Sequence, residues 1–214
     1  REAVKYLDGP LLVLAGAGSG KTRVITRKIA YLVTQCGIEA RHIAAITFTN
    51  KAAREMRERV GELLPGKQGQ GLTVSTFHSL GLSILRAEAR RLGYKPRFSV
   101  LDAADANGIL SDILKNPDKA GLRQAASVIS NWKNALLSPA EALKVAEDEA
   151  QRQTAVAYQA YQDTLRAYQA MDFDDLIRLP VELFRQHPEA RETWQGRLRY
   201  LLVETAFPDS LHDL

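Results

Sequence analysis

Along much of the chain, short apolar runs are followed by longer amphipathic stretches. The short runs are residues 11–14, 43–48, 72–76 and 198–204. The amphipathic stretches, with apolar residues every third or fourth position, are residues 23–34, 51–64 and 78–92. Short apolar runs suit the strands of a buried parallel sheet, and the amphipathic stretches suit helices that cover it. The pattern therefore predicts an α/β fold in which a parallel sheet is flanked by helices.

The middle of the chain has a different composition and pattern. From Asp102 to about Ala170 there are few strand-like runs and many Ala, Gln, Lys, Asp and Glu residues. Ser138, Pro139 and Glu141 stand in the order typical of a helix start, as N-cap, first helical residue and third helical residue. We therefore predict an all-helical insertion at residues 88–170. The sheet is then formed by residues 1–87 and 171–214.

Composition adds mild constraints. The 214 residues carry a net charge of +4, which weakly favours a polyanionic partner. The single cysteine, Cys36, excludes an internal disulfide, fits a reducing compartment and is expected to be a buried structural thiol. No signal peptide is visible, and no apolar run approaches the roughly 20 residues of a membrane span. We expect a cytoplasmic protein without a membrane partner, and residues preceding Arg1, because the chain does not begin with Met.

The segment Ala15-Gly16-Ala17-Gly18-Ser19-Gly20-Lys21-Thr22 has the spacing of a phosphate-binding loop, with Ala15 where the strict pattern has Gly. Glycines let successive backbone N–H groups turn inward around a phosphate. Lys21 supplies a cation for the β- and γ-phosphates, and Thr22 offers a hydroxyl to Mg²⁺. A ligand-free glycine turn is disfavoured, because an apolar run precedes the loop and a helix follows it. The loop predicts ATP and Mg²⁺ binding, with Arg23 either solvated or facing the base.

Four segments resemble, in order, the motifs of superfamily 1A DNA helicases of the UvrD/Rep type. They are residues 15–22, 45–53 (Ala-Ile-Thr-Phe-Thr-Asn-Lys-Ala-Ala), 74–81 (Val-Ser-Thr-Phe-His-Ser-Leu-Gly) and 171–176 (Met-Asp-Phe-Asp-Asp-Leu). Residues 41–45 and 129–134 look specifically like bacterial Rep members of the family. The resemblance spans nearly the whole chain.

The resemblance implies a P-loop, RecA-like motor domain, called 1A, with a helical insertion, called 1B. Such enzymes use ATP and Mg²⁺ to translocate 3′→5′ on single-stranded DNA and to unwind 3′-tailed duplex DNA. The resemblance also implies a second motor domain, 2A, with an insertion, 2B, that this sequence lacks. Because ATP lies between 1A and 2A in the family, this chain is expected to hold half a site. Lys21 and Thr22 would contact phosphate and Mg²⁺, and Arg23 would lie against adenine.

Two predicted strand ends resemble the family's DNA channel. The resemblance implies that Phe48 contacts a base or sugar, that Thr49 and Asn50 contact a phosphate, and that Thr76 and His78 also contact DNA. The carboxyl edge of a parallel sheet does present polar groups and helix N-termini, and an aromatic ring there can stack on a base. From the residues alone, Phe48 in the core and His78 as a structural or capping residue remain alternatives.

Two charged groups have competing interpretations. Asp172, Asp174 and Asp175 suggest a metal cluster, but we favour a helix cap by Asp172 with the other two in the first turn, where carboxylates suit the helix dipole. A basic set either follows a DNA backbone or forms a solvated helix face. Its members are Arg86, Arg90, Arg91, Lys95 and Arg97.

The chain departs from the family at its last motif. After residues 201–203 the family pattern implies Asp-Glu-x-x-Asp, whose Asp holds Mg²⁺ through water and whose Glu activates the attacking water. Glu204 and Thr205 stand at these positions, and Thr cannot act as a base. Glu204 is left to hold Mg²⁺ through a longer arm. Residues 210–214 resemble nothing in the family, which suggests a truncated or altered reading frame, and the glutamine expected before Arg1 is not in the sequence.

Two function classes follow. The first is an enzyme: the ATP-binding motor segment of a 3′→5′ DNA helicase, with Lys21 and Glu204 as catalytic candidates. The second is a module that binds DNA or nucleotide without turnover. A nucleotide kinase would need an acceptor site, and a helicase–nuclease subunit would need a further domain. Because of Thr205 and the lacking 2A domain, we expect this chain alone to be inactive in hydrolysis and unwinding.

Overall fold

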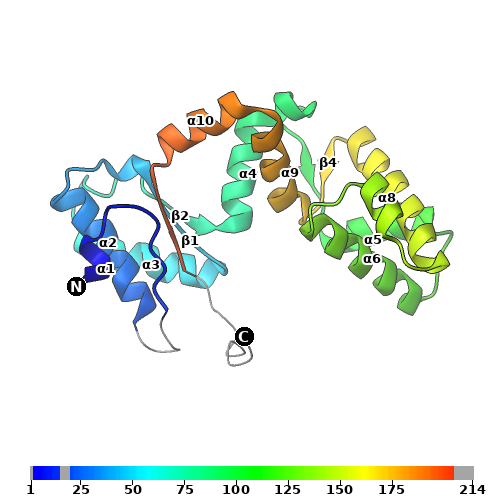
Figure 1. The fold of residues 1–214 in the computed structure, drawn as a ribbon, viewed down its shortest axis with the longest axis horizontal. Helices are drawn as coiled ribbons and strands as arrows, with labels where there is room; N and C mark the ends of the chain where they lie inside the picture. Colours follow the sequence, from blue (N-terminus) through cyan, green and yellow to red (C-terminus); the bar gives the residue numbers. More distant parts are fainter. Residues whose placement is uncertain (1, 15–19, 205–214) are drawn as a thin grey trace. The chain divides into compact units, whose positions relative to one another are not determined.

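The computed structural model describes residues 2–14 and 20–204 (Figure 1). The predicted contacts of Ala15, Gly16, Ala17, Gly18, Ser19 and Thr205 lie outside the described residues. The helices are α1 (Glu2–Lys5), α2 (Lys21–Thr34), α3 (Asn50–Leu63), α4 (Phe77–Glu88), α5 (Ala103–Ile113), α6 (Lys119–Asn134), α7 (Pro139–Val145), α8 (Glu149–Ala167), α9 (Asp175–Gln186) and α10 (Pro188–Arg197). The strands are β1 (Ile43–Thr47), β2 (Thr73–Thr76), β3 (Ser99–Val100), β4 (Ala170–Met171) and β5 (Tyr200–Val203).

The chain divides into two compact units. The first comprises residues 1–80 and 191–214, and the second comprises residues 81–190. The division falls within α4 and α10, and each unit has its own parallel strands. None of the helices in the described ranges is long and apolar enough to cross a membrane.

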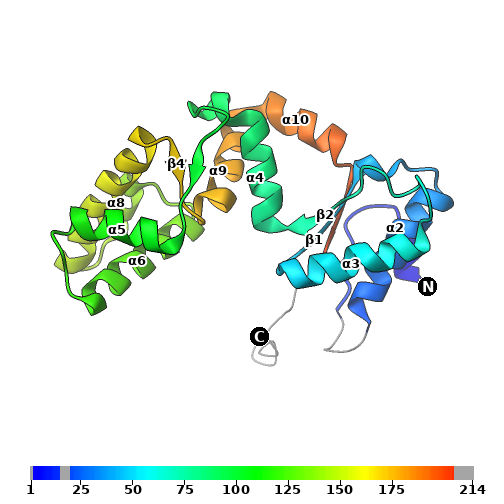
Figure 2. The same ribbon diagram turned by 180° about the vertical axis from the view of Figure 1, so that it is seen from behind.

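The first unit is built on a three-stranded parallel sheet of order β2-β1-β5. Helices α2 and α3 cover one face, as the view from behind also shows (Figure 2). Ile29 and Leu32 of α2 pack with Met56 of α3 against Ile43 of the central strand, and all four side chains are inaccessible to solvent. Cys36 is only partly buried, at the margin of this core. The predicted α/β fold with a helix-flanked parallel sheet is confirmed.

The strand predicted at residues 11–14 is wrong. These residues have no strand structure, and Leu12 and Leu14 are 72% and 70% exposed. The apolar run led to the prediction, but a strand also needs a ladder of backbone hydrogen bonds. Instead, α1 is tied to α2, because the Lys28 ammonium donates to the carbonyl of Ala3 at 3.0 Å. Residues of this segment and of β5 line the same pocket.

The second unit is mainly helical, as predicted for most of residues 88–170. Trp132 of α6 and Tyr158 of α8 stack in its core with ring centroids 6.3 Å apart. The predicted start of α7 is confirmed, since the Ser138 hydroxyl accepts from the backbone N–H of Glu141 while the Glu141 carboxylate accepts from that of Ser138. The region is not entirely helical, however. Strand β3 pairs in parallel with β4, and two residues are too few to produce a period in the sequence.

Candidate nucleotide and nucleic-acid site

The candidate site lies at the carboxyl edge of the three-stranded sheet. Because all three strands are parallel, their carboxyl ends meet at one edge. Thr47 pairs with Thr76, and Ile46 pairs with Val203, so the residues that follow the strands come together. The sheet register therefore brings Phe48, Phe77 and Glu204 to the same edge.

The start of α2 forms the candidate phosphate end of this edge. Gly20 precedes the helix with φ of 85°, a left-handed conformation that glycine adopts without strain. Lys21 and Thr22 then occupy the first helical turn, where backbone N–H groups and the helix dipole favour an anion. Arg23 is exposed on the same turn.

Glu204 joins this end of the site from β5. Its backbone N–H donates to the carbonyl of Ile46 at 2.8 Å, which extends the strand pairing by one residue. Its carboxylate accepts a hydrogen bond from the hydroxyl of Thr22. The fold thus joins a helix start and a strand end that lie 182 positions apart in the sequence.

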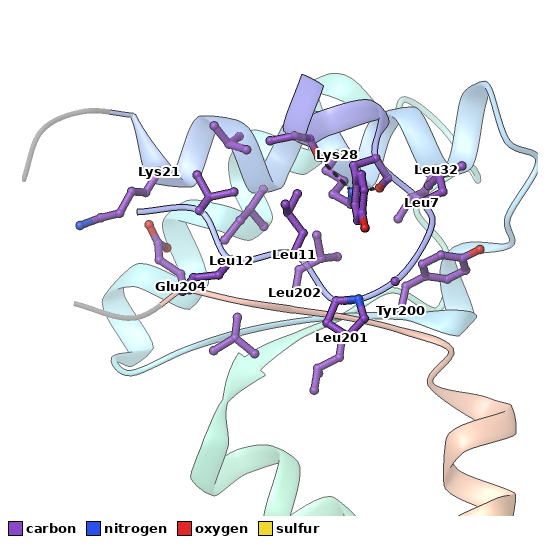
Figure 3. Close-up of a pocket in the computed structure, with 18 of the residues that line it drawn as sticks. Leu7, Leu11, Leu12, Lys21, Lys28, Leu32, Tyr200, Leu201, Leu202 and Glu204 are labelled. Atoms are coloured by element: carbon purple, nitrogen blue, oxygen red, sulfur yellow. Dashed lines mark hydrogen bonds between the residues drawn. The ribbon is translucent and has the colours of Figure 1, made fainter. Parts of the chain in front are cut away.

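A pocket of about 640 Å³ extends from this point (Figure 3). Lys21 and Glu204 lie at one end, and the rest of the lining is largely apolar and includes leucines from residues 7–12 and β5. Apolar walls do not suit a phosphate, so an anion is expected to bind at the end that holds Lys21, Thr22 and Glu204.

The oxygen donors at this end suit Mg²⁺. A hydroxyl and a carboxylate are hard ligands, and Mg²⁺ in nucleotide sites is held by one or two protein oxygens together with substrate phosphates. Among the described residues there is no group of three or more His, Cys, Asp and Glu able to hold a metal ion by itself. The residues therefore fit a cation that arrives with a nucleotide.

At the end of β1, Phe48 is on the surface rather than in the core. Its side chain is 59% exposed, and its ring lies 5.5 Å from that of Phe77, between centroids, at an angle of 54°. Asn50 is exposed at the start of α3, and the Thr49 hydroxyl caps that helix by accepting from the N–H of Ala52 at 3.1 Å. The sequence interpretation did not select Phe77. It directly follows β2, as Phe48 directly follows β1, and this matching position after a strand could have identified it as a site residue.

At the end of β2, the predicted contacts differ in accessibility. Thr76 is buried, and its hydroxyl both accepts from the N–H of Ser79 at 3.2 Å and donates to the hydroxyl of Ser79 at 3.0 Å. The Thr76 side chain is thus engaged at the start of α4. His78 is half-buried in the first turn of the same helix.

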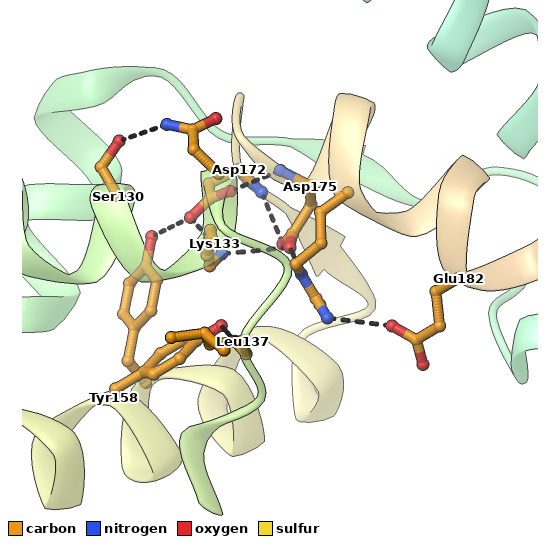
Figure 4. A network of polar contacts seen from close by, with 10 residues as sticks. Ser130, Lys133, Leu137, Tyr158, Asp172, Asp175 and Glu182 are labelled. Carbon is orange, nitrogen blue, oxygen red and sulfur yellow. Dashed lines mark hydrogen bonds and ion pairs between the residues drawn. The ribbon is translucent and has the colours of Figure 1, made fainter. Parts of the chain in front are cut away.

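The acidic segment of the second unit forms a buried ionic network (Figure 4). Asp172 accepts from the backbone N–H of Asp175, the first residue of α9, at 3.0 Å, but the N-cap position belongs to Asp174, which was predicted in the first turn and whose side chain makes no cap hydrogen bond. Asp175 does lie in the first turn of α9, as predicted, but its side chain is fully buried. The Lys133 ammonium, also fully buried, lies 2.6 Å from a carboxylate oxygen of Asp172 and 3.1 Å from one of Asp175.

Further hydrogen bonds complete this network. The Tyr161 hydroxyl donates to Asp172 at 2.9 Å, and Arg178 pairs with Asp175 at 3.1 Å. Burial opposes ionisation of Asp172, but the Lys133 ammonium together with the hydrogen bonds from Asp175 and Tyr161 outweighs it, so the pKa of this carboxyl is lowered. Burial raises the pKa of Asp175 against the attraction of Lys133. The Lys133 ammonium contacts both carboxylates, as a bound metal ion would have to do. We therefore interpret Asp172 and Asp175 as structural residues.

Sequence reasoning missed Lys133. It lies four residues after Ile129 and one after Trp132, on the apolar stripe of α6. A lysine on such a stripe requires a buried partner, and the paired aspartates were the candidates.

The predicted basic set is partly engaged within the protein. Arg86 donates to the carbonyls of Pro96 and Phe98, and its guanidinium lies 3.9 Å from the centroid of the Phe98 ring. Arg91 pairs with Glu88 and Glu189 at 2.8 and 2.6 Å. These two arginines therefore hold their own unit together, while Arg90, Lys95 and Arg97 are exposed.

Comparison with known proteins agrees with the motif order. A family model described as the UvrD/REP helicase N-terminal domain matches residues 1–206. The ATP-dependent DNA helicases Rep of Salmonella typhimurium and of Escherichia coli are each 52% identical over 207 residues, which is 95% of this chain and 31% of theirs. PcrA of Staphylococcus aureus, also named an ATP-dependent DNA helicase, is 45% identical over 95% of this chain and 28% of its own. The chain spans less than a third of these relatives, and it belongs to the UvrD/Rep helicase family.

Proposed function

We propose that this chain is the ATP-binding motor segment of an ATP-dependent 3′→5′ DNA helicase that translocates on single-stranded DNA. One observation carries the proposal: the first turn of α2, with Lys21 and Thr22, meets Glu204 at the carboxyl edge of a parallel sheet. In this proposal residues 1–87 and 171–214 are the RecA-like domain 1A, and residues 88–170 are the insertion 1B. The named activity of the relatives supports it.

Each site residue has a distinct role in this proposal. Lys21 binds the β- and γ-phosphates of ATP, Thr22 and Glu204 hold the end of the site that receives Mg²⁺, and Arg23 faces the base. When bound, Mg²⁺ neutralises developing charge on the phosphates. Phe48, Asn50 and His78 face the DNA, while Thr49 and Thr76 fix the helix starts that present them. Because Thr205 is no base, the chain alone binds these ligands without appreciable hydrolysis or unwinding.

Replacing Lys21 by alanine is expected to weaken ATP binding about ten-fold to a hundred-fold, since charge-assisted hydrogen bonds are worth about 1.5–3 kcal/mol. Isothermal titration calorimetry with ATP and Mg²⁺ measures the effect. Lys67→Ala, in an exposed turn of the same unit, serves as the control and should leave the affinity unchanged. Equal affinities of the Lys21 variant and the control would remove Lys21 from the site. DNA-stimulated ATP turnover that Lys21→Ala abolishes would instead refute the predicted inactivity.

Replacing Phe48 by alanine is expected to weaken binding of single-stranded DNA roughly 5-fold to 100-fold, because stacking of a base on an aromatic ring contributes about 1–3 kcal/mol. Fluorescence anisotropy of a labelled oligonucleotide over a salt series provides the measurement. Leu63→Ala, another exposed apolar residue of the unit, is the matched control. Affinity should fall steeply with salt for both variants if phosphates are contacted. Identical affinities for the two variants would argue against stacking on Phe48.

A further inference from the structure

A groove of about 460 Å³, called here the α5–α6 groove, lies in the second unit, and its lining residues all belong to that unit. Its apolar floor comes mainly from two helices, with Ala106 and Leu110 on α5 and Ala126 and Ile129 on α6. The volume falls within the range of about 300–1,000 Å³ that is typical of ligand pockets. The groove is therefore large enough to receive side chains of another molecule.

The charge of this groove is opposite to that of the whole chain. Every charged residue in its lining is acidic, namely Asp102, Asp172 and Asp174, whereas the chain carries a net charge of +4. A phosphate backbone is repelled by carboxylates, so the groove does not suit nucleic acid. A cation is attracted to the same groups, and the apolar floor favours a cation that has an apolar part.

Two of the three carboxylates are available to a ligand. The charge of Asp172 is compensated by Lys133, as Figure 4 shows. Asp174 is half-buried before α9, and among the described residues its side chain forms no ion pair and no cap hydrogen bond. Asp102 is exposed and uses one carboxylate oxygen to accept from the N–H of Asp105 at 2.9 Å, which leaves its other oxygen for a partner.

We propose that the α5–α6 groove binds a basic segment of a partner protein, whose lysine or arginine side chain pairs with Asp174 and Asp102 while a neighbouring apolar side chain packs on the floor. Lysine and arginine suit this lining because each has a charged end on an apolar stem. A free amine lacks the neighbouring apolar side chain, so it would bury less apolar area in the groove. The inference concerns the second unit alone and does not depend on the proposed binding of nucleotide or DNA.

The test titrates the whole chain with the peptide Gly-Ser-Gly-Leu-Lys-Leu-Gly-Ser-Gly, up to about 1 mM, in a calorimeter. Replacing the lysine of the peptide by norleucine keeps the stem and removes the charge, and should weaken binding about ten-fold or more. Replacing both leucines by alanine should also weaken binding about ten-fold or more, because the apolar contact is lost. Hexylammonium, a free amine of similar stem length, should bind at least about ten-fold more weakly than the peptide.

Variants of the chain locate the binding surface. Asp174→Asn should weaken binding of the lysine peptide about ten-fold, and Asp102→Asn roughly two-fold to five-fold, because the more exposed carboxylate is better screened by solvent. Asparagine preserves the shape of the side chain and caps helices as well as aspartate does. Asp112→Asn is the matched control, since Asp112 is an exposed carboxylate of α5 outside the groove lining, and it should leave the affinity unchanged.

Each remaining outcome counts against the inference. Equal affinities of the lysine and norleucine peptides would show that the groove does not recognise charge. A loss in Asp112→Asn as large as that in Asp174→Asn would replace the groove by a general effect of negative charge. Hexylammonium that binds as tightly as the peptide would make a free amine the occupant, and no binding of the lysine peptide to the folded chain would remove the site. Thermal unfolding of every variant verifies that a weaker affinity is not a loss of fold.

Discussion

Replacing Lys133 by methionine is expected to lower the free energy of unfolding of the second unit by about 3–5 kcal/mol. Removing one partner of a buried ion pair leaves the other charges without compensation, and that cost is typically of this size. Here two carboxylates lose the same cation, since the ammonium lies 2.6 Å from Asp172 and 3.1 Å from Asp175, although Arg178 still pairs with Asp175. Methionine preserves most of the side-chain volume, so the change reports charge rather than a cavity.

Urea denaturation followed by the fluorescence of Trp132 measures this effect. Trp132 lies beside Lys133 on α6, and a Trp194→Phe background removes the signal of the first unit. Lys119→Met is the matched control, because Lys119 is exposed on the same helix, and it should change stability by less than about 0.5 kcal/mol. A loss below about 1 kcal/mol in Lys133→Met would show that the aspartates do not depend on this cation.

The pH dependence of the same variant provides an independent check. The pKa of Asp172 is lowered in the folded chain, so its contribution to stability is present above the ordinary carboxylate pKa and is lost as pH falls below it. Without Lys133, burial raises the pKa of both carboxyls. Ionising them in the folded chain then costs free energy, so their contribution to stability decreases as pH rises. The destabilisation caused by Lys133→Met should therefore be smaller near pH 4 than near pH 7.

The sequence allowed prediction of elements that have a repeating pattern or a local hydrogen-bond signature. The amphipathic stretches at residues 23–34 and 51–64 form α2 and α3, and the capping box at Ser138 is present, because the causes of each lie within a few residues of one another. The carboxyl edge of the sheet was predictable for a similar reason: once the strands are parallel, Phe48 and Glu204 must follow strand ends on one side.

What the sequence did not reveal depends on partners far away in the chain. The run at residues 11–14 has the composition of a strand, but pairing depends on where β5 lies and on how Lys28 holds α1. Asp175 lies in the first turn of α9 as predicted, but its burial against Lys133, 42 positions earlier by the numbering, could not be inferred from neighbouring residues. Thr76 has the family motif around it, yet the capping of α4 by its hydroxyl required the turn geometry. Which charges pair, and which capping side chains are buried, depends on the folded structure rather than on neighbouring residues in the sequence.

Replacing Gly81 by alanine is expected to destabilise the second unit by about 3 kcal/mol, at the upper end of typical overpacking costs, although alanine is the better helix former by about 1 kcal/mol. A Cβ atom at Gly81 of α4 would lie 1.9 Å from the carbonyl oxygen of Leu176 in α9, a distance that requires backbone movement. That carbonyl lacks its usual helical donor, because the residue four positions later is Pro180, which has no N–H. The close approach of α4 thus covers a carbonyl that the helix itself cannot satisfy.

Gly108→Ala is the matched control for this substitution. Gly108 lies in α5, where an added Cβ would meet no atom within 4 Å, so alanine there should stabilise the unit by up to about 1 kcal/mol. The two glycine-to-alanine changes are therefore expected to have opposite signs in the same urea denaturation experiment. If both variants were stabilised, helix propensity alone would account for the glycines, and α4 and α9 would not be in the close contact that Gly81 permits. If only Gly81→Ala is destabilised, the spacing of α4 and α9 is set by the contact between Gly81 and the carbonyl of Leu176, which Pro180 leaves without a helical donor.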